Sequence, residues 1–162
     1  MIGLLSCKKD DDNKTTHLVN YKKSLNKWNE LKSENGNSYT YKTTFISWVG
    51  AGSTTEVKVE NGKVTGRNYQ QFIIDNAGQR TVVDSYTETA LEVGSHEKGA
   101  KPMTIDQLYN SCIGEYLVVD DKTNTIYFET DASGIMTSCG FVPDNCADDC
   151  FRGVTINGLN WL

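Results

Sequence analysis

The sequence feature that most constrains the fold is the Asn61-Gly62 pair, which lies between two segments of alternating polar and apolar residues. A two-residue type I′ turn needs positive φ at both central residues, and Asn and Gly adopt that conformation most readily. A loop of this length sets Val59 opposite Val64, so we expect these valines to pair on the buried face. The pair therefore predicts an antiparallel hairpin.

Other segments also alternate with a period of two residues, which is typical of half-buried strands. One such segment follows the predicted first helix, and two short apolar runs around Asn76-Ala77-Gly78 predict a second hairpin. On this basis the segments expected to be strands are 39–45, 55–60, 63–65, 71–74, 81–83, 126–129, 135–142 and 154–156.

Two further segments have the pattern of helices. In the first, apolar residues recur at spacings of three and four until Asn35-Gly36 supplies a stop. That stripe, which we interpret as core, consists of Leu18, Tyr21, Leu25, Trp28 and Leu31. The second helix begins after Thr104, because Thr104 and Gln107 have the spacing of a capping box. The order of elements predicts an α+β fold, an antiparallel β-sheet with two helices packed on one face.

The composition limits the classes of protein to which the chain can belong. Its 162 residues carry 16 Lys+Arg and 21 Asp+Glu, a formal net charge of −5, and 38% of them are hydrophobic. This length fits one domain, and the apolar content is too high for a disordered chain. There is no apolar run long enough to span a bilayer. The acidic balance without a Lys/Arg cluster predicts no nucleic-acid partner.

The amino-terminal segment Leu4-Leu5-Ser6-Cys7 resembles a bacterial lipoprotein processing site. The Lys-then-Asp run that follows it is similar to the export tag of surface-displayed lipoproteins in the Bacteroidetes. The resemblance implies that Cys7 is lipidated and that residues 1–7 are the remnant of a signal with a lipobox. It also implies a partner, the membrane, and a location at the bacterial outer membrane or cell surface. We expect residues 8–16 to be a flexible polar tether and 17–162 to be a single α+β domain.

A wider resemblance covers about residues 20–158. The Trp-bearing helix, Tyr39-x-Tyr41, Val57-x-Val59-x-Asn61-Gly62-x-Val64, Thr104-Ile105-x-x-Leu108 and the strand and turn from Ile126 to Gly134 carry it. Together they resemble an uncharacterised family of small bacterial surface lipoproteins. That family has no established catalytic residues, so the likeness implies fold and location only.

If Cys7 carries lipid, four cysteines remain, and an even number in an oxidising compartment predicts two disulfides. Four cysteines permit three pairings. Cys112 lies on the apolar face of the second helix and Cys139 shares strand parity with core residues, so we expect Cys112 to pair with Cys139. Cys146 would then pair with Cys150, which requires an irregular turn because Cβ atoms at i and i+4 of a helix are too far apart.

The loop around these last cysteines is rich in oxygen ligands, which a hard cation such as calcium accepts. The residues concerned are Asp144, Asn145, Asp148 and Asp149. Acidic loops are more often simply solvated, and the pattern of an EF-hand is absent. The cysteine spacings also do not fit the common zinc patterns. We therefore expect no cofactor and keep calcium as an alternative.

Motifs for catalysis are lacking in this sequence. Nucleophilic catalysis needs a nucleophile beside an oriented base, and the chain has only two histidines. Ser95, His96 and Glu97 are consecutive loop residues, so they cannot all face one another. There is also no glycine-rich nucleotide loop and no G-x-S-x-G turn. We therefore expect a protein that is not an enzyme.

The function that fits these features is an extracytoplasmic, lipid-anchored binding or structural module. Exposed aromatic residues would contact a protein or glycan ligand, and the candidates are Trp48, Tyr69 and Trp161. One alternative is a proteinaceous inhibitor or accessory partner of a secreted or periplasmic enzyme. Another is a calcium-dependent surface module. The identity of the ligand and the oligomeric state stay open.

Overall fold

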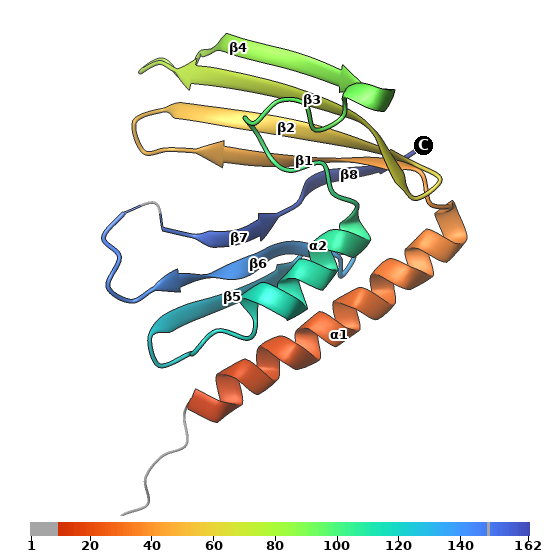
Figure 1. Cartoon of the computed structure of the whole chain (residues 1–162). Helices are drawn as coiled ribbons and strands as arrows, with labels where there is room; N and C mark the ends of the chain where they lie inside the picture. The colour runs from red at the N-terminus through yellow and green to blue at the C-terminus, as the bar shows by residue number, and fades with distance from the viewer. Residues whose placement is uncertain (1–9, 149) are drawn as a thin grey trace, which may run out of the picture.

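The structure is a computed structural model that describes residues 10–148 and 150–162. In this part of the chain, two helices and eight strands form an α+β fold with two antiparallel sheets (Figure 1), which confirms the predicted fold class. Along the chain the elements are α1 (Asp10–Asn35), β1 (Tyr39–Ile46), β2 (Ala51–Glu60), β3 (Lys63–Ile74), β4 (Arg80–Thr89), η1 (Ala90–Glu92), α2 (Ile105–Ser111), η2 (Cys112–Tyr116), β5 (Asn124–Thr130), β6 (Met136–Pro143), β7 (Arg152–Thr155) and β8 (Asn157–Trp161). Among the described residues, no helix has the length and apolar content needed to cross a membrane.

The division into two sheets corrects the expectation of a single sheet with both helices on one face. The strand order is β4-β3-β2-β1-β8 in one sheet and β5-β6-β7 in the other. The last two strands connect the sheets, because β7 pairs with β6 while β8, one residue later, pairs with β1. At this crossing the Ile156 amide donates to the Thr137 carbonyl at 2.8 Å. The split depends on pairing between segments that are distant in the sequence, which local periodicity does not encode.

Helix α1 contacts both sheets and closes the core between them. Trp28 is fully buried, lies edge-on to Tyr39 of β1 at 5.2 Å between ring centroids, and stacks on Trp161 of β8 at 5.4 Å. Nearer the start of the helix, Tyr21 lies edge-on to Phe128 of β5 at 6.0 Å. The aromatic stripe of this helix is therefore core, as its spacing predicted.

Both predicted hairpins are present. Val59 pairs with Val64, and Asn61 and Gly62 have φ of 49° and 75°, as a type I′ turn requires. The second hairpin joins β3 and β4, and β4 continues to Thr89, well beyond the short apolar run that predicted it. The extension consists of polar residues that pair with β3 along their whole length.

The first helix is longer than its apolar stripe indicated. It begins at Asp10, so residues 10–16, which we expected to be a flexible tether, are helical. The Lys14 ammonium donates to the Val119 carbonyl at 3.1 Å, a tertiary contact that a polar sequence does not reveal. Asp, Asn and Thr, which make up most of this segment, are poor helix formers, so local propensity does not predict the extension. Residues 8 and 9 of the expected tether, and Cys7, lie outside the described residues.

The second helix begins as its capping box predicted. The Gln107 amide donates to Thr104 Oγ1 at 3.2 Å, and the Thr104 amide donates to Gln107 Oε1 at 2.8 Å. The box fixes the start of a short helix whose Ile105, Leu108 and Tyr109 are buried.

Both predicted disulfides are confirmed. Cys112 is bonded to Cys139, which ties η2 to β6, and Cys146 is bonded to Cys150 within the β6–β7 loop. The second pair lies in an irregular turn rather than a helix, as its spacing required. The two disulfides indicate an oxidising, extracytoplasmic environment.

Candidate functional site

The turn between β1 and β2 carries a run of large apolar side chains that face solvent. Trp48 is 80% exposed, and Phe45, Ile46 and Val49 are all more than half exposed. The turn is closed by its own backbone, because the Ser47 amide donates to the Ala51 carbonyl at 2.8 Å. Its apolar side chains therefore project from a hydrogen-bonded turn and make little contribution to the core.

The neighbouring strands β3 and β4 extend this apolar surface. Ile73 pairs with Ala51, so it lies beside the β1–β2 turn, and it is about half exposed. Val82 and Val83 at the start of β4 are also about half exposed, where the register between β3 and β4 shifts. Two adjacent hairpin ends thus present exposed apolar side chains at the same end of the five-stranded sheet.

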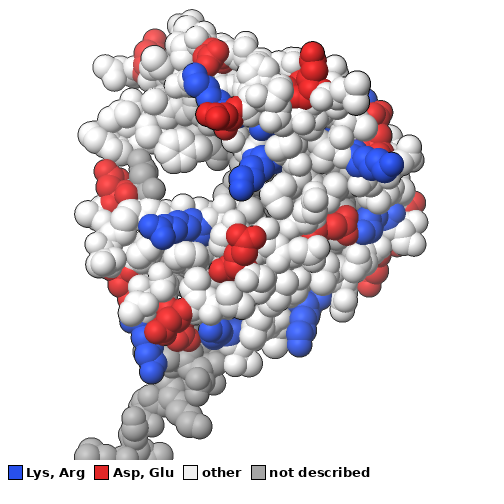
Figure 2. Space-filling view, viewed as in Figure 1, with Lys and Arg blue, Asp and Glu red and all other residues white. Residues whose placement is uncertain are grey.

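The β6–β7 loop reaches the same region from the other sheet. Phe45 borders a hollow that is also lined by Val142, Phe151 and the Cys146–Cys150 disulfide. Figure 2 shows this hollow between the upper and lower parts of the molecule. The free ends of the two sheets therefore face each other across an open gap with apolar walls.

The first turns of α1 lie at this end as well. Lys14 binds the carbonyl of Val119 in the α2–β5 connection, and the adjacent Val118 is more than half exposed. The same connection contacts the β6–β7 loop, because the Asp144 amide donates to the Thr123 carbonyl at 3.1 Å. In Figure 1 the start of α1 and these loops lie on the left side of the molecule. We call this region the apolar end, and its exposed members are Phe45, Ile46, Trp48, Val49, Ile73, Val82, Val83, Val118 and Phe151.

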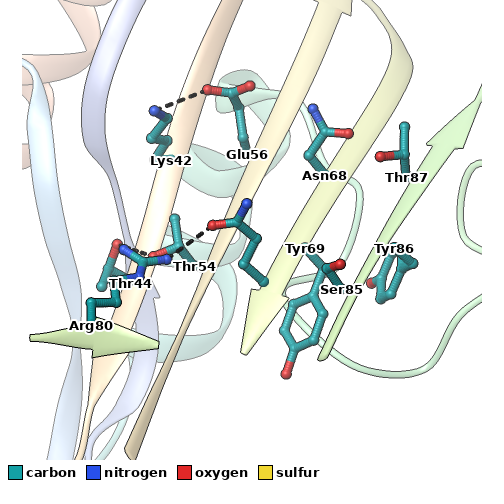
Figure 3. Close-up of a pocket in the computed structure, with 11 residues that line it drawn as sticks. Lys42, Thr44, Thr54, Glu56, Asn68, Tyr69, Arg80, Ser85, Tyr86 and Thr87 are labelled. Carbon is teal, nitrogen blue, oxygen red and sulfur yellow. Dashed lines mark hydrogen bonds and ion pairs between the residues drawn. The ribbon is translucent and has the colours of Figure 1, made fainter. Parts of the chain in front are cut away.

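A second hollow lies on the outer face of the five-stranded sheet, and it is polar (Figure 3). Its side chains largely pair with one another: Lys42 with Glu56 at 3.2 Å, and Arg80 with Gln70 at 3.1 Å. Paired polar residues are what an antiparallel sheet ordinarily presents to water. This face therefore does not by itself indicate a ligand.

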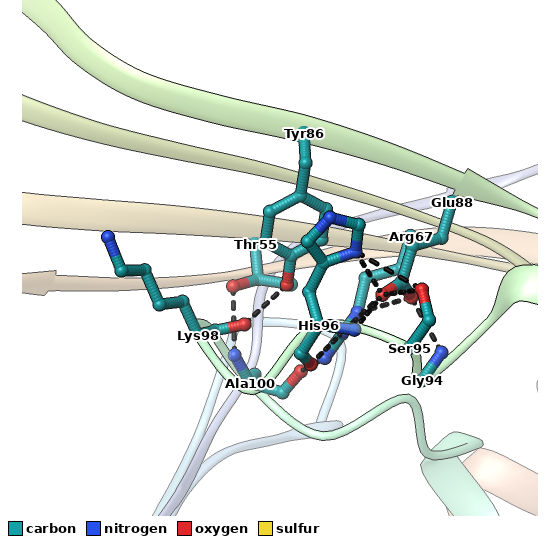
Figure 4. Close-up of polar contacts among 9 residues, drawn as sticks. All are labelled: Thr55, Arg67, Tyr86, Glu88, Gly94, Ser95, His96, Lys98 and Ala100. Atoms are coloured by element: carbon teal, nitrogen blue, oxygen red, sulfur yellow. Dashed lines mark hydrogen bonds and ion pairs between the residues drawn. The ribbon is translucent and has the colours of Figure 1, made fainter.

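The described part of the chain also contains a buried ion pair that the sequence did not reveal. Arg67 of β3 donates to both carboxylate oxygens of Glu88 of β4, at 2.9 and 2.6 Å, and both side chains are inaccessible to solvent (Figure 4). The Arg67 guanidinium holds the pKa of Glu88 far below its ordinary value, although burial opposes this. The amides of Gly94 and His96 also donate to this carboxylate and lower its pKa further.

This ion pair holds the long η1–α2 connection against the sheet. Arg67 also donates to the carbonyls of His96 at 2.6 Å and Ala100 at 2.9 Å. His96 stacks on Tyr86 at 4.0 Å between ring centroids, and Tyr86 stacks on Tyr69 at 5.1 Å. These contacts satisfy the buried charges and explain why a connection without secondary structure is ordered over β3 and β4.

Glu88 also brings a carboxylate to Ser95 and His96, but the geometry is not that of a catalytic triad. Ser95 Oγ lies 3.2 Å from His96 Nδ1, and Glu88 Oε1 lies 3.0 Å from the same nitrogen. In a triad the serine and the acid contact opposite ring nitrogens. The carboxylate therefore cannot hold this imidazole by one nitrogen while the other nitrogen accepts the serine proton, and the cluster serves to anchor the connection.

The three aromatic residues predicted to contact a ligand differ in their exposure to solvent. Trp48 is exposed, as expected. Tyr69 is only 5% exposed, because it faces the same side of β3 as Arg67, beneath the η1–α2 connection. Trp161 is half-buried and stacks on Trp28. The prediction of exposed contact residues was therefore wrong for Tyr69 and Trp161.

The acidic loop contains three described residues of the predicted calcium site, Asp144, Asn145 and Asp148, all of them exposed. The Asp144 carboxylate accepts a hydrogen bond from Thr125 Oγ1 at 3.3 Å. Asp149 lies outside the described residues. Within residues 10–148 and 150–162, no three His, Cys, Asp or Glu side chains are grouped as metal ligands. Calcium binding stays a prediction.

Protein families, curated proteins and solved structures were compared with this chain, and none of them matches it.

Proposed function

We propose that this chain is an extracytoplasmic, lipid-anchored binding module whose contact surface is the apolar end. The observation that carries the proposal is the exposure of Trp48. Its side chain is 80% exposed, and the neighbouring residues of the turn are also apolar and exposed. A contiguous exposed apolar surface on a folded domain commonly marks a site of interaction. Large aromatic residues of this kind dominate the binding energy of interfaces.

The lipid anchor rests on the resemblance of Leu4-Leu5-Ser6-Cys7 to a lipoprotein processing site. The disulfides support the extracytoplasmic location that such processing requires. Helix α1 begins three residues after Cys7, and three residues span at most about 11 Å. An acyl chain on Cys7 would therefore hold the start of the helix close to the surface of the outer membrane.

Cross-linking in the native host tests this proposal. A photoreactive amino acid at position 48 is expected to give cross-linked products, because this position lies in the contact surface. The matched control is position 91, since Leu91 is fully exposed but belongs to η1, outside the apolar end. Equal cross-linking at the two positions would rule out the apolar end as the contact surface.

The identity of the product separates the module from the inhibitor or accessory partner. One stoichiometric secreted or periplasmic enzyme at position 48 would support the inhibitor, whereas lipid, glycan or a non-enzymatic protein would support the module.

Metabolic labelling with palmitate tests the lipid anchor, and we expect Cys7→Ser to abolish incorporation of the label. Label that persists in this variant would contradict lipidation at Cys7.

A further inference from the structure

We propose that the apolar end lies on the lipid bilayer itself, with the side chains of the β1–β2 turn inserted into the membrane interface. This inference rests on the proposed function and names the partner of the same surface. It makes the bilayer a second attachment, in addition to the acyl chains at Cys7.

The form of the β1–β2 turn suits insertion into a lipid interface. Trp48 and Val49 are at its tip, beyond the last residue pair of the hairpin, Ile46 and Gly52, and Ile46 is itself more than half exposed. Tryptophan favours the interfacial region, where its ring is apolar and its N–H can still reach polar groups. A protein partner would need a complementary pocket for this convex apolar tip, whereas a bilayer needs none.

Part of the backbone of the turn, on either side of its tip, is already paired. The Ser47 amide donates to the Ala51 carbonyl, the Gly50 amide donates to the Ser47 carbonyl at 3.0 Å, and the Ile74 amide donates to the Gly50 carbonyl at 2.8 Å. Backbone groups that are already paired cost little to move out of water.

The position of α1 directs this surface toward the membrane. The Lys14–Val119 and Asp144–Thr123 bonds connect the first turns of α1, through two loops, to the hollow beside Phe45. In Figure 1 the start of α1 lies at the lower left and the β1–β2 turn at the upper left, so both are at the left edge of the molecule. A chain anchored three residues before α1 would have this side closest to the bilayer.

The charges at this end indicate which lipids are involved. The loops β3–β4, α2–β5 and β6–β7 carry mainly acidic residues, which are Asp75, Asp120, Asp121, Asp144 and Asp148, with Lys122 as a basic residue. Such loops are not attracted to anionic headgroups. Binding would therefore depend on apolar insertion, be at least as strong on zwitterionic as on anionic membranes, and not be weakened by salt.

Vesicle partitioning of the full chain tests this inference. Cys7→Ser removes the acylation site, so that only the folded domain contributes to binding. We expect this chain to partition onto phosphatidylcholine vesicles, and we expect added phosphatidylglycerol not to increase the partitioning. Brominated phosphatidylcholine should quench Trp48 selectively, because Trp28 is fully buried and Trp161 stacks on it.

Two variants in the Cys7→Ser background identify the surface. Replacing Trp48 and Val49 by serine removes two exposed apolar side chains and should weaken partitioning by roughly tenfold or more. The matched control, Leu91→Ser, removes an equally exposed side chain in η1 and should leave partitioning unchanged. Near-UV circular dichroism shows whether each variant is folded.

The inference would be overturned if the chain did not bind phosphatidylcholine vesicles, if binding required anionic lipid, or if the Trp48 and Val49 variant bound as well as the parent. A protein or glycan cross-linked at position 48, combined with no vesicle binding, would overturn the bilayer as partner and leave the proposed function intact. No vesicle binding and no selective cross-link would overturn both.

Discussion

At the scale of single residues, Glu88 explains how a connection without regular structure is held in place. Its carboxylate accepts hydrogen bonds from Arg67 and from the amides of Gly94 and His96. The carboxylate is fully buried, so its charge is stable only with these partners. One side chain thus joins β3, β4 and the η1–α2 connection.

We therefore expect Glu88→Gln to destabilise the fold by about 3 to 5 kcal/mol, since it leaves the Arg67 charge buried and uncompensated. Urea unfolding at neutral pH measures this loss. Glu92→Gln is the matched control, because Glu92 is exposed and lies four residues further along the chain. Equal stabilities for the two variants would contradict the structural importance of the ion pair.

The same residue predicts a dependence on pH. Because folding lowers the pKa of Glu88 from its ordinary value of 4.5, its stabilising contribution is complete above that value. The contribution is lost as the pH falls below 4.5 toward the pKa of the folded state. The difference in stability between the parent and Glu88→Gln should accordingly shrink on acidification. A difference that stayed constant down to the lowest pH at which the protein folds would contradict this pKa shift.

At the scale of elements, the two disulfides close loops of very different length. Cys112 and Cys139 are separated by 27 positions and connect η2 with β6, whereas Cys146 and Cys150 are separated by 4 within one loop. A cross-link stabilises a fold largely by restricting the unfolded chain, and longer loops give the larger effect. The first disulfide is therefore the structural one.

Replacing Cys112 and Cys139 by alanine should cost about 3 to 4 kcal/mol, and replacing Cys146 and Cys150 about 2 kcal/mol. Thermal or urea unfolding of the two double variants under the same conditions gives the comparison. The ranking would be refuted by a larger loss in the variant that lacks the Cys146–Cys150 bond.

Elements defined by neighbouring residues were predictable from the sequence. The Asn61-Gly62 pair fixed the register of its hairpin, and Thr104 with Gln107 fixed the start of α2. The pairing of Cys112 with Cys139 followed from the direction of each side chain along a helix and a strand. In each case the information lies within a few residues, where turn geometry and periodicity determine the structure.

Features that depend on distant contacts were not predictable. The charges of Arg67 and Glu88 look like ordinary exposed residues of polar strands until the η1–α2 connection covers them. Tyr69 is buried by the same connection, and Trp161 by stacking on α1. Of the candidate site, only Trp48 could be identified, because its exposure follows from the local turn.

At the scale of the whole molecule, the core is made by elements from the beginning, middle and end of the sequence. α1 and β8 meet through Trp28 and Trp161, and α2 lies against α1 and β6 through Tyr109. The apolar end, by contrast, contributes little to this core. The residues that hold the fold together are thus separate from those proposed to contact a partner.

This separation predicts that replacing two different tryptophans will have unequal effects on the stability of the protein. Trp161→Ala should destabilise the protein by about 3 kcal/mol, because it removes a ring stacked on the buried Trp28. Trp48→Ala should change the stability by less than about 0.5 kcal/mol, since its side chain is 80% exposed. Thermal unfolding compares the two, and a large loss of stability in Trp48→Ala would show that the turn belongs to the core.

The pairing of β1 with β8 has a consequence for the order in which the chain folds. Tyr39 of β1 lies opposite Trp161, which is near the other end of the sequence. Until β8 is available, β1 keeps an open edge of unpaired amides and carbonyls, which neighbouring unfolded chains could occupy. The five-stranded sheet can therefore be completed only after residues 157–161 have been made, and the interval before that is when the chain is most exposed to pairing with other copies.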